Sequence, residues 1–116
     1  MNTPICSFVE KYASERNVRL HMPAHKGKGI LGFEKYDITE ISGADVLYSA
    51  DGIIAESENN LTSLYGTCHS FYSTEGSSLA LRAMLHLACL HAREEGREPC
   101  IAAAPNAHKT FLSAVA

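Results

Sequence analysis

A glycine and two serines, Gly76-Ser77-Ser78, stand where an extended run of residues gives way to a long helical pattern. A helix that begins there directs free backbone N–H groups and two hydroxyls at one point, which is how helix starts hold phosphate. The glycine permits close approach of the backbone, and the helix dipole favours an anion. The segment Asn106-Ala107-His108-Lys109-Thr110 follows about one strand-helix-strand unit later, where it could reach the same pocket edge. A phosphate site beside an imidazole indicates a phosphorylated cofactor.

Each of these residues also has an ordinary structural interpretation. Serine is a favoured residue at helix starts, so Gly76-Ser77-Ser78 could be only a helix N-cap. His108 could be a structural histidine whose hydrogen bonds are satisfied. Lys109 beside it invites a Schiff base with a cofactor aldehyde such as that of pyridoxal phosphate, although most surface lysines are only solvated. The sequence leaves these alternatives open.

Two further groups of polar residues precede this region. Asp37, Glu40 and Asp45 could form a carboxylate cluster, or they could act as caps and turn residues in a loop. Residues 21–27 are polar and rich in glycine, so this loop could border a substrate site.

The composition is that of a globular protein. The chain has 116 residues, of which 46% are hydrophobic and 20% charged, enough for one small domain. Its formal net charge of −3 offers no basic surface for a nucleic-acid partner. No apolar run approaches the ~20 residues of a membrane span, and the N-terminus lacks the pattern of a signal peptide. We expect a cytoplasmic protein without a nucleic-acid or membrane partner.

The cysteines do not form a redox or zinc motif. They are far apart and include no C-x-x-C pair: Cys6, Cys68, Cys89 and Cys100. Without a secretory signal, we expect reduced, buried thiols that behave as small hydrophobic groups. Zinc is the alternative, because His21 and His25 are four residues apart, but Pro23 between them disfavours a helix that presents both. No metal site is expected.

Hydrophobic periodicity predicts four helices, over residues 4–16, 53–65, 77–94 and from 107 to the end. Gly66 and Gly96 are the expected helix stops. The third helix is apolar on most of its faces, so we expect other parts of the structure to cover it.

Two short segments rich in β-branched or apolar residues, 67–74 and 100–104, are predicted strands. The order strand, helix, strand, helix predicts a right-handed parallel βαβ crossover. Two parallel strands are too few for a stable sheet, and the chain stops inside an apolar run. We therefore expect an α/β fold with a mostly parallel sheet, incomplete in this chain, which would be the N-terminal piece of a longer protein.

Five sequence blocks resemble, in order and spacing, the start of the large domain of the ornithine/lysine/arginine decarboxylases, which are pyridoxal-phosphate enzymes of the aspartate-aminotransferase fold (fold type I). The blocks are His21-Met22-Pro23-Ala24-His25-Lys26-Gly27, Asp37-Ile38-Thr39-Glu40, Gly43-Ala44-Asp45-Val46-Leu47, Glu75-Gly76-Ser77-Ser78 and Asn106-Ala107-His108-Lys109-Thr110. Each block alone is weak, and the five in order are specific. The resemblance implies an N-terminal helix or arm over residues 1–18 and, over 19–116, the beginning of the cofactor-binding major domain.

The resemblance also implies roles for individual residues. Those that would bind the cofactor are Gly76, Ser77, Ser78, Leu79 and His108. The serines and the backbone beside them would match the phosphate-binding turn of the family, and His108 would match the histidine that stacks on the cofactor ring. Lys109 would match the first of two His-Lys pairs. The lysine that anchors the cofactor and the aspartate that pairs with its ring nitrogen would then lie beyond Ala116.

By the same resemblance, the full protein would use pyridoxal phosphate to decarboxylate lysine, arginine or ornithine. It would release carbon dioxide and a polyamine-type amine, and it would assemble as a homodimer or a larger homo-oligomer. The 116-residue chain alone is expected to be inactive. Two alternatives stay open: another pyridoxal-phosphate enzyme of this fold, such as an aminotransferase or lyase, and a non-catalytic module that kept the phosphate turn. The sequence does not indicate which basic amino acid would be used.

Overall fold

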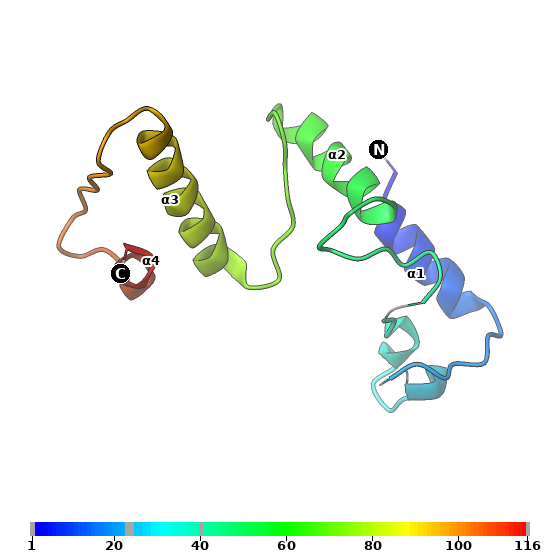
Figure 1. Ribbon diagram of the computed structural model, residues 1–116. Helices are drawn as coiled ribbons and strands as arrows, with labels where there is room; N and C mark the ends of the chain where they lie inside the picture. The colour runs from blue at the N-terminus through cyan, green and yellow to red at the C-terminus, as the bar shows by residue number, and fades with distance from the viewer. Residues whose placement is uncertain (1, 23–24, 40, 116) are drawn as a thin grey trace. The chain divides into compact units, whose positions relative to one another are not determined.

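The computed structural model describes residues 2–22, 25–39 and 41–115. The chain divides into two compact units, Met1–Tyr72 and Ser73–Ala116. We refer to them as the first and the second unit. Each is built from helices joined by irregular segments (Figure 1).

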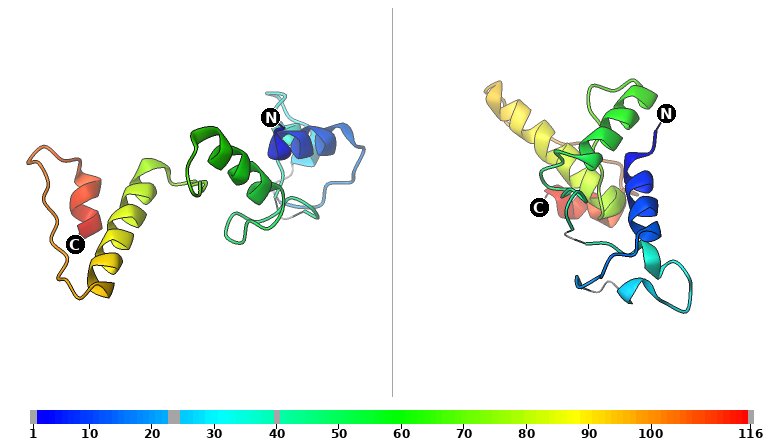
Figure 2. Two further views of the ribbon diagram at one scale, coloured as in Figure 1. Left: turned by 90° about the horizontal axis from the view of Figure 1, so that it is seen from above. Right: turned by 90° about the vertical axis from the view of Figure 1, so that its right-hand side faces the viewer.

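In the first unit, helix α1 (Pro4–Ser14) packs against helix α2 (Ile53–Tyr65). Two 3-10 turns, η1 (His25–Gly27) and η2 (Glu34–Tyr36), contact each other, and η2 also contacts α1. Figure 2 shows the same pair of long helices from two further sides. Both helix predictions for this unit are confirmed, with α1 ending two residues early.

The ends of these helices follow local sequence signals. Pro4 occupies the start of α1, where its missing N–H costs no hydrogen bond. Gly66 follows α2 in the left-handed conformation, with φ of +64°, and its N–H donates to the carbonyl of Thr62. Glycine adopts this conformation without the steric cost of a Cβ atom, so Gly66 ends the helix as its position predicts.

Polar contacts connect α2 to the residue before α1 and to the segment that follows α2. The Nδ2 of Asn60 lies 2.8 Å from the Oδ1 of Asn2, just before α1. On another part of α2, Oε1 of the buried Glu58 accepts the backbone N–H of Tyr72 at 2.8 Å. The hydroxyls of Ser57 and Tyr72 are 2.7 Å apart. The segment after α2 is therefore held on the helix by polar atoms.

The start of α2 is organised by one carboxylate, that of Asp45. It accepts hydrogen bonds from four backbone N–H groups, at N···O distances of 2.7 to 3.2 Å. The donors are Val46, Asp51, Gly52 and Ile54. Partial burial of the carboxylate would raise its pKa, but these four hydrogen bonds lower the pKa of Asp45 well below its usual value. Gly52, the residue before the helix, provides no side-chain cap, so Asp45 supplies the cap from a distance in sequence.

In the second unit, α3 (Gly76–Glu94) packs against the shorter α4 (Lys109–Val115). A guanidinium nitrogen of Arg82 lies 3.2 Å from the Ser113 hydroxyl and joins the two helices. Gly96, at φ of +71°, ends α3, and its N–H donates to the carbonyl of Arg93 at 2.9 Å. Both helices were predicted from the hydrophobic pattern, and both are confirmed.

Much of the apolar surface of α3 is open. The exposed fractions are 39% for Leu79, 59% for Met84, 63% for Leu87 and 39% for Leu90. The prediction that α3 is covered on most sides is therefore wrong for the described structure. Among the described residues of this unit, the helix that packs on α3 is the seven-residue α4, which is too short to cover a helix of 19 residues.

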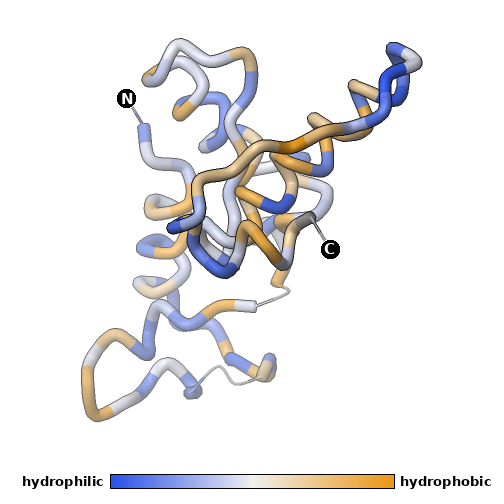
Figure 3. Tube along the Cα trace, turned by 90° about the vertical axis from the view of Figure 1, so that its left-hand side faces the viewer, coloured by the Kyte–Doolittle hydropathy of each residue, from blue (hydrophilic) through white to orange (hydrophobic). Residues whose placement is uncertain are grey.

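The predicted sheet is absent: the described residues, 2–22, 25–39 and 41–115, contain no β-strand. Residues 67–74 and 100–104, expected as parallel strands, are irregular. Figure 3 shows 100–104 as a continuous hydrophobic stretch of the trace. A strand exists only where a neighbour pairs its backbone N–H and C=O groups, and neither segment has one here. The α/β fold class, the βαβ crossover and the mostly parallel sheet are wrong for this structure, which is helical.

The predicted burial of the cysteines is also wrong. Cys6, Cys68 and Cys100 are exposed, and Cys89 is half-buried. The reason is the small interior of each unit, in which few side chains are buried at all. Over the part of the chain that the structure describes, no helix combines the length and the apolar character that crossing a bilayer requires.

We predict that Asp45→Asn lowers the stability of the first unit, because an amide replaces the charged acceptor of four N–H groups. Asparagine tolerates the left-handed backbone that Asp45 adopts, at φ of +63°, so the variant isolates the charge. Since the folded-state pKa of Asp45 lies below its unfolded value of about 3.9, the carboxylate stabilises the fold above that pH and the effect fades as the pH falls below it.

Helix content followed by circular dichroism from pH 7 to pH 2 checks this prediction. Wild type and Asp45→Asn should differ at pH 7 and converge at low pH. Asp51→Asn is the matched control, because Asp51 contributes its backbone N–H and not its side chain to the Asp45 cluster. A constant difference across the pH range would contradict the assignment.

Candidate functional site

The start of α3 leaves its first backbone N–H groups without a side-chain cap. Glu75 precedes the helix and makes no side-chain capping bond. Gly76 has φ of +63°, and, apart from its chain neighbours and the backbone of its own helix, no described atom lies within 4 Å of the position that a Cβ would occupy there. Ser77, Ser78 and Leu79 are exposed. The predicted phosphate turn is therefore an open helix start, accessible from solvent.

The structure joins two of the predicted residues, Ser78 and His108, through a third. The hydroxyl of Thr110 lies 3.3 Å from that of Ser78 and 3.0 Å from Nδ1 of His108. Thr110 is buried, with 9% of its surface exposed. The starts of α3 and α4, about thirty residues apart in sequence, are thus connected by one chain of polar atoms.

A backbone hydrogen bond orients the His108 ring. The N–H of Thr110 donates to Nδ1 at 3.3 Å, so Nδ1 is the acceptor in this arrangement. Only Nε2 is then left to donate to another group. His108 also caps the start of α4 by accepting this N–H, as a structural histidine would.

Thr110 is the residue that sequence reasoning missed. It lies within the quoted block 106–110, but no role was assigned to it. The available signal was a β-branched hydroxyl residue two positions after a histidine at a helix start, a spacing that allows both side chains to meet. Lys109, between them, is exposed.

The polar residues of the first unit separate into different roles. Asp45 is committed to the backbone at the start of α2, as its interpretation as a loop cap predicts. Nε2 of His25 lies 3.3 Å from Oδ2 of Asp37. Glu40 of the possible carboxylate cluster, and Pro23 and Ala24 of the 21–27 loop, lie outside the described residues. No group of three or more His, Cys, Asp or Glu placed to hold a metal ion occurs within the described ranges.

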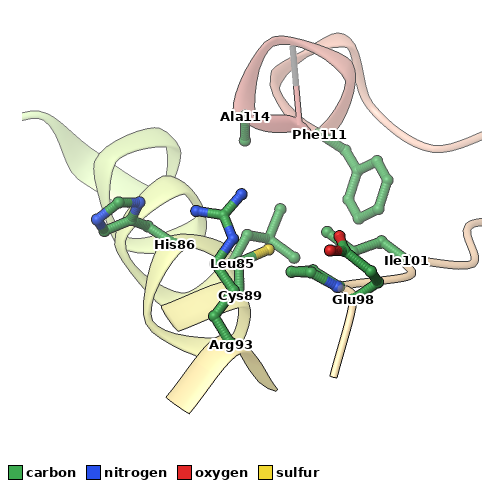
Figure 4. Close-up of a pocket in the computed structure, with 9 residues that line it drawn as sticks. Leu85, His86, Cys89, Arg93, Glu98, Ile101, Phe111 and Ala114 are labelled. Carbon is green, nitrogen blue, oxygen red and sulfur yellow. The ribbon is translucent and has the colours of Figure 1, made fainter. Parts of the chain in front are cut away.

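A pocket of about 620 Å³ lies elsewhere in the second unit. Figure 4 shows that Leu85 and Cys89 of α3 face Phe111 of α4 and Ile101 of the segment before it. Arg93 also lines the pocket. None of the predicted cofactor-binding residues lines it, so this pocket and the predicted phosphate site are separate features.

Comparison with known proteins finds several distant relatives that share one name. The chain is 28% identical over 123 aligned residues to a protein named arginine decarboxylase from Bacillus subtilis, with 97% of this chain and 24% of the relative aligned. A protein of the same name from Halalkalibacterium halodurans is 29% identical over 97% of this chain and 24% of its own length. One from Bacillus cereus is 26% identical, over 97% and 25%. The chain thus spans about a quarter of the length of these relatives.

These comparisons correct the family assignment. No protein-family model matches the chain, and no solved structure matches it significantly. The described residues form no sheet, whereas the fold of the ornithine/lysine/arginine decarboxylases requires one. Assignment to that family, as the start of its α/β major domain, is therefore wrong on these findings. The chain is distantly similar to about a quarter of the length of proteins named arginine decarboxylase, as a fragment of a basic-amino-acid decarboxylase would be.

We predict that Thr110→Val destabilises the second unit by about 1 kcal/mol, because it removes a buried hydroxyl that bridges two side chains and keeps the shape of the residue. Chemical denaturation followed by circular dichroism measures the change. Thr67→Val is the control: the Thr67 hydroxyl is exposed and pairs with Ser70, so the change should stay within about 0.5 kcal/mol. Equal effects of the two substitutions would contradict a bridging role for Thr110.

Proposed function

We propose that this chain is part of a decarboxylase of arginine or another basic amino acid, and that pyridoxal phosphate is its cofactor. The names of the relatives support the reaction class, since they favour decarboxylation over amino transfer. The observation that carries the cofactor proposal is the connection between an uncapped helix start and an imidazole, through Ser78, Thr110 and His108.

The residues at the start of α3 are compatible with a phosphate group. The first N–H groups of a helix have no partner within the helix, and in α3 no side chain caps them. The space around Gly76 is open, so a phosphate could approach the backbone closely. The helix dipole and the exposed Ser78 hydroxyl add to the attraction. Glu75 is exposed, so solvent screens its charge.

His108 would lie beside the cofactor ring in this proposal. Its Nδ1 is occupied by the N–H of Thr110, which fixes the ring orientation and leaves Nε2–H as a donor. When bound, pyridoxal phosphate supplies the electron sink that a decarboxylation requires. The chain's own contribution is to hold the phosphate with backbone N–H groups and serine hydroxyls, and so to fix the position of the ring.

The same proposal includes a cytoplasmic location and assembly of the whole protein into a homodimer or larger homo-oligomer. The four cysteines are free thiols, which is common in a reducing compartment. The substrate bound at the site would be an amino acid with a cationic side chain.

Pyridoxine 5′-phosphate tests the proposed site, because it lacks the aldehyde that reacts with any lysine. Titrated into the ¹⁵N-labelled chain, it should shift the amide signals of residues 76–79 and 108. Ser78→Ala should weaken the binding about tenfold, the effect of losing one hydrogen bond to a charged group.

Ser63→Ala is the matched control, since the Ser63 hydroxyl bonds to the carbonyl of Asn59 on α2. Inorganic phosphate should bind at the same amides more weakly, and pyridoxine without phosphate should not bind there. Amide shifts that spare residues 76–79, or that Ser78→Ala leaves unchanged, would refute the phosphate site.

A further inference from the structure

One side of α3 is both apolar and exposed. The helix meets α4 on the side that carries Ser78, Arg82 and Leu85. At about 100° per residue, a second set of positions covers about 140° of the helix on the opposite side. We call this set the exposed α3 face, and its residues are Leu79, Ala80, Ala83, Met84, Leu87 and Leu90.

The exposed α3 face is continuous and uncharged between Leu79 and Leu90. Its larger side chains stand well out into solvent, with exposed fractions of 59% for Met84 and 63% for Leu87. Single exposed apolar residues are normal on a protein surface, but a contiguous apolar patch marks an interaction surface. Burial of this face against another apolar surface would be favourable.

The ends of α3 carry charge in an unfavourable order. Its first turn has no acidic residue and no side-chain cap, whereas Glu94 is its last residue. The helix dipole favours the reverse, with carboxylates at the start and cations at the end. His91 lies 3.4 Å from Glu95, and Arg93 lines the pocket beside α4. Glu94 has no ion pair within the described residues.

Glu94 lies in line with the exposed α3 face. Gly76 and Glu94 are the first and last of the 19 residues of α3. At about 3.6 residues per turn, this separation places them on the same side of the helix, at opposite ends of the apolar positions. A partner on this face would therefore meet an uncapped helix start at one end and a carboxylate at the other.

We propose that the exposed α3 face binds the same face of a second copy of this chain, with the two α3 helices antiparallel. Each Glu94 then lies beside the uncapped start of the other α3, where free N–H groups and the helix dipole attract a carboxylate. Glu75, just before that start, is exposed, so solvent screens its repulsion. Parallel pairing would instead place Glu94 beside Glu94 and leave both helix starts unmatched.

The sizes of the residues fit the antiparallel register. When Glu94 of one copy lies beside Gly76 of the other, Ala80 lies beside Leu90 and Ala83 beside Leu87. A small residue opposite a large one lets two helices approach and interdigitate. Charge and size thus favour the same arrangement. This surface would serve the homo-oligomer included in the proposed function, but the inference does not rest on the proposed reaction or cofactor.

Sedimentation velocity of the whole chain in phosphate-free buffer, from about 1 μM to about 500 μM, tests the proposal. The dimer fraction should rise with concentration. Leu87→Lys should weaken the dimer at least about tenfold, because it places a charge in the middle of the apolar face. Leu112→Lys is the matched control, since Leu112 lies on α4 and is 65% exposed, against 63% for Leu87.

A monomer at every concentration, or species larger than a dimer, would overturn the proposal. So would a dimer that Leu87→Lys leaves unchanged or that Leu112→Lys weakens equally. Pyridoxine 5′-phosphate is absent from this experiment, so dimer formation and the phosphate site can fail separately.

Glu94→Gln tests the antiparallel orientation without altering the apolar face. In the antiparallel dimer it removes an attraction at each end and should weaken association roughly threefold. In a parallel dimer it would relieve repulsion and strengthen association, which would overturn the proposed orientation. Glu10→Gln is the control for the change in net charge, since Glu10 is an exposed residue of α1 and should leave the dimer unchanged.

Discussion

The first unit depends on the carboxylate of Asp45. Few apolar side chains are buried in this unit, so its order comes largely from polar contacts. Asp45 gathers four backbone N–H groups and sets the point at which α2 begins. The position of α2 in turn places Glu58, whose carboxylate holds the backbone of Tyr72. A negative charge that accepts several N–H groups stabilises a turn more strongly than a neutral acceptor, because charge-assisted hydrogen bonds are the stronger kind.

The same physical feature recurs in both units. In the second unit, the Thr110 hydroxyl connects the starts of two helices. In the first unit, the backbone N–H of Leu31 holds one oxygen of Glu34. In each case a backbone or hydroxyl group fixes the position of a polar side chain.

Helices were predictable, because their signals are local. The periodicity of α2 and α3, with Gly66 and Gly96 as stops, gave both elements to within one residue at each end. The strands were not predictable, because a segment such as 100–104 becomes a strand only when another segment pairs with it. The predictions that α3 is covered and that the cysteines are buried failed for a related reason. Both properties depend on which other residues pack against the residue in question. Of the candidate phosphate site, the sequence indicated Ser78 and His108, while Thr110 between them was assigned no role.

By itself, the sequence determined where the helices begin and end to within about two residues, and it indicated candidate residues for a phosphate site. Capping residues, glycine stops and helical periodicity act over a few residues, so they can be recognised in the chain alone. Only the tertiary structure decided that Asp45 is a structural cap and Asp37 faces a pocket, although both are aspartates in the same loop region. The physical reason is that a carboxylate's role is set by which donors reach it, and those donors come from residues brought near by the fold.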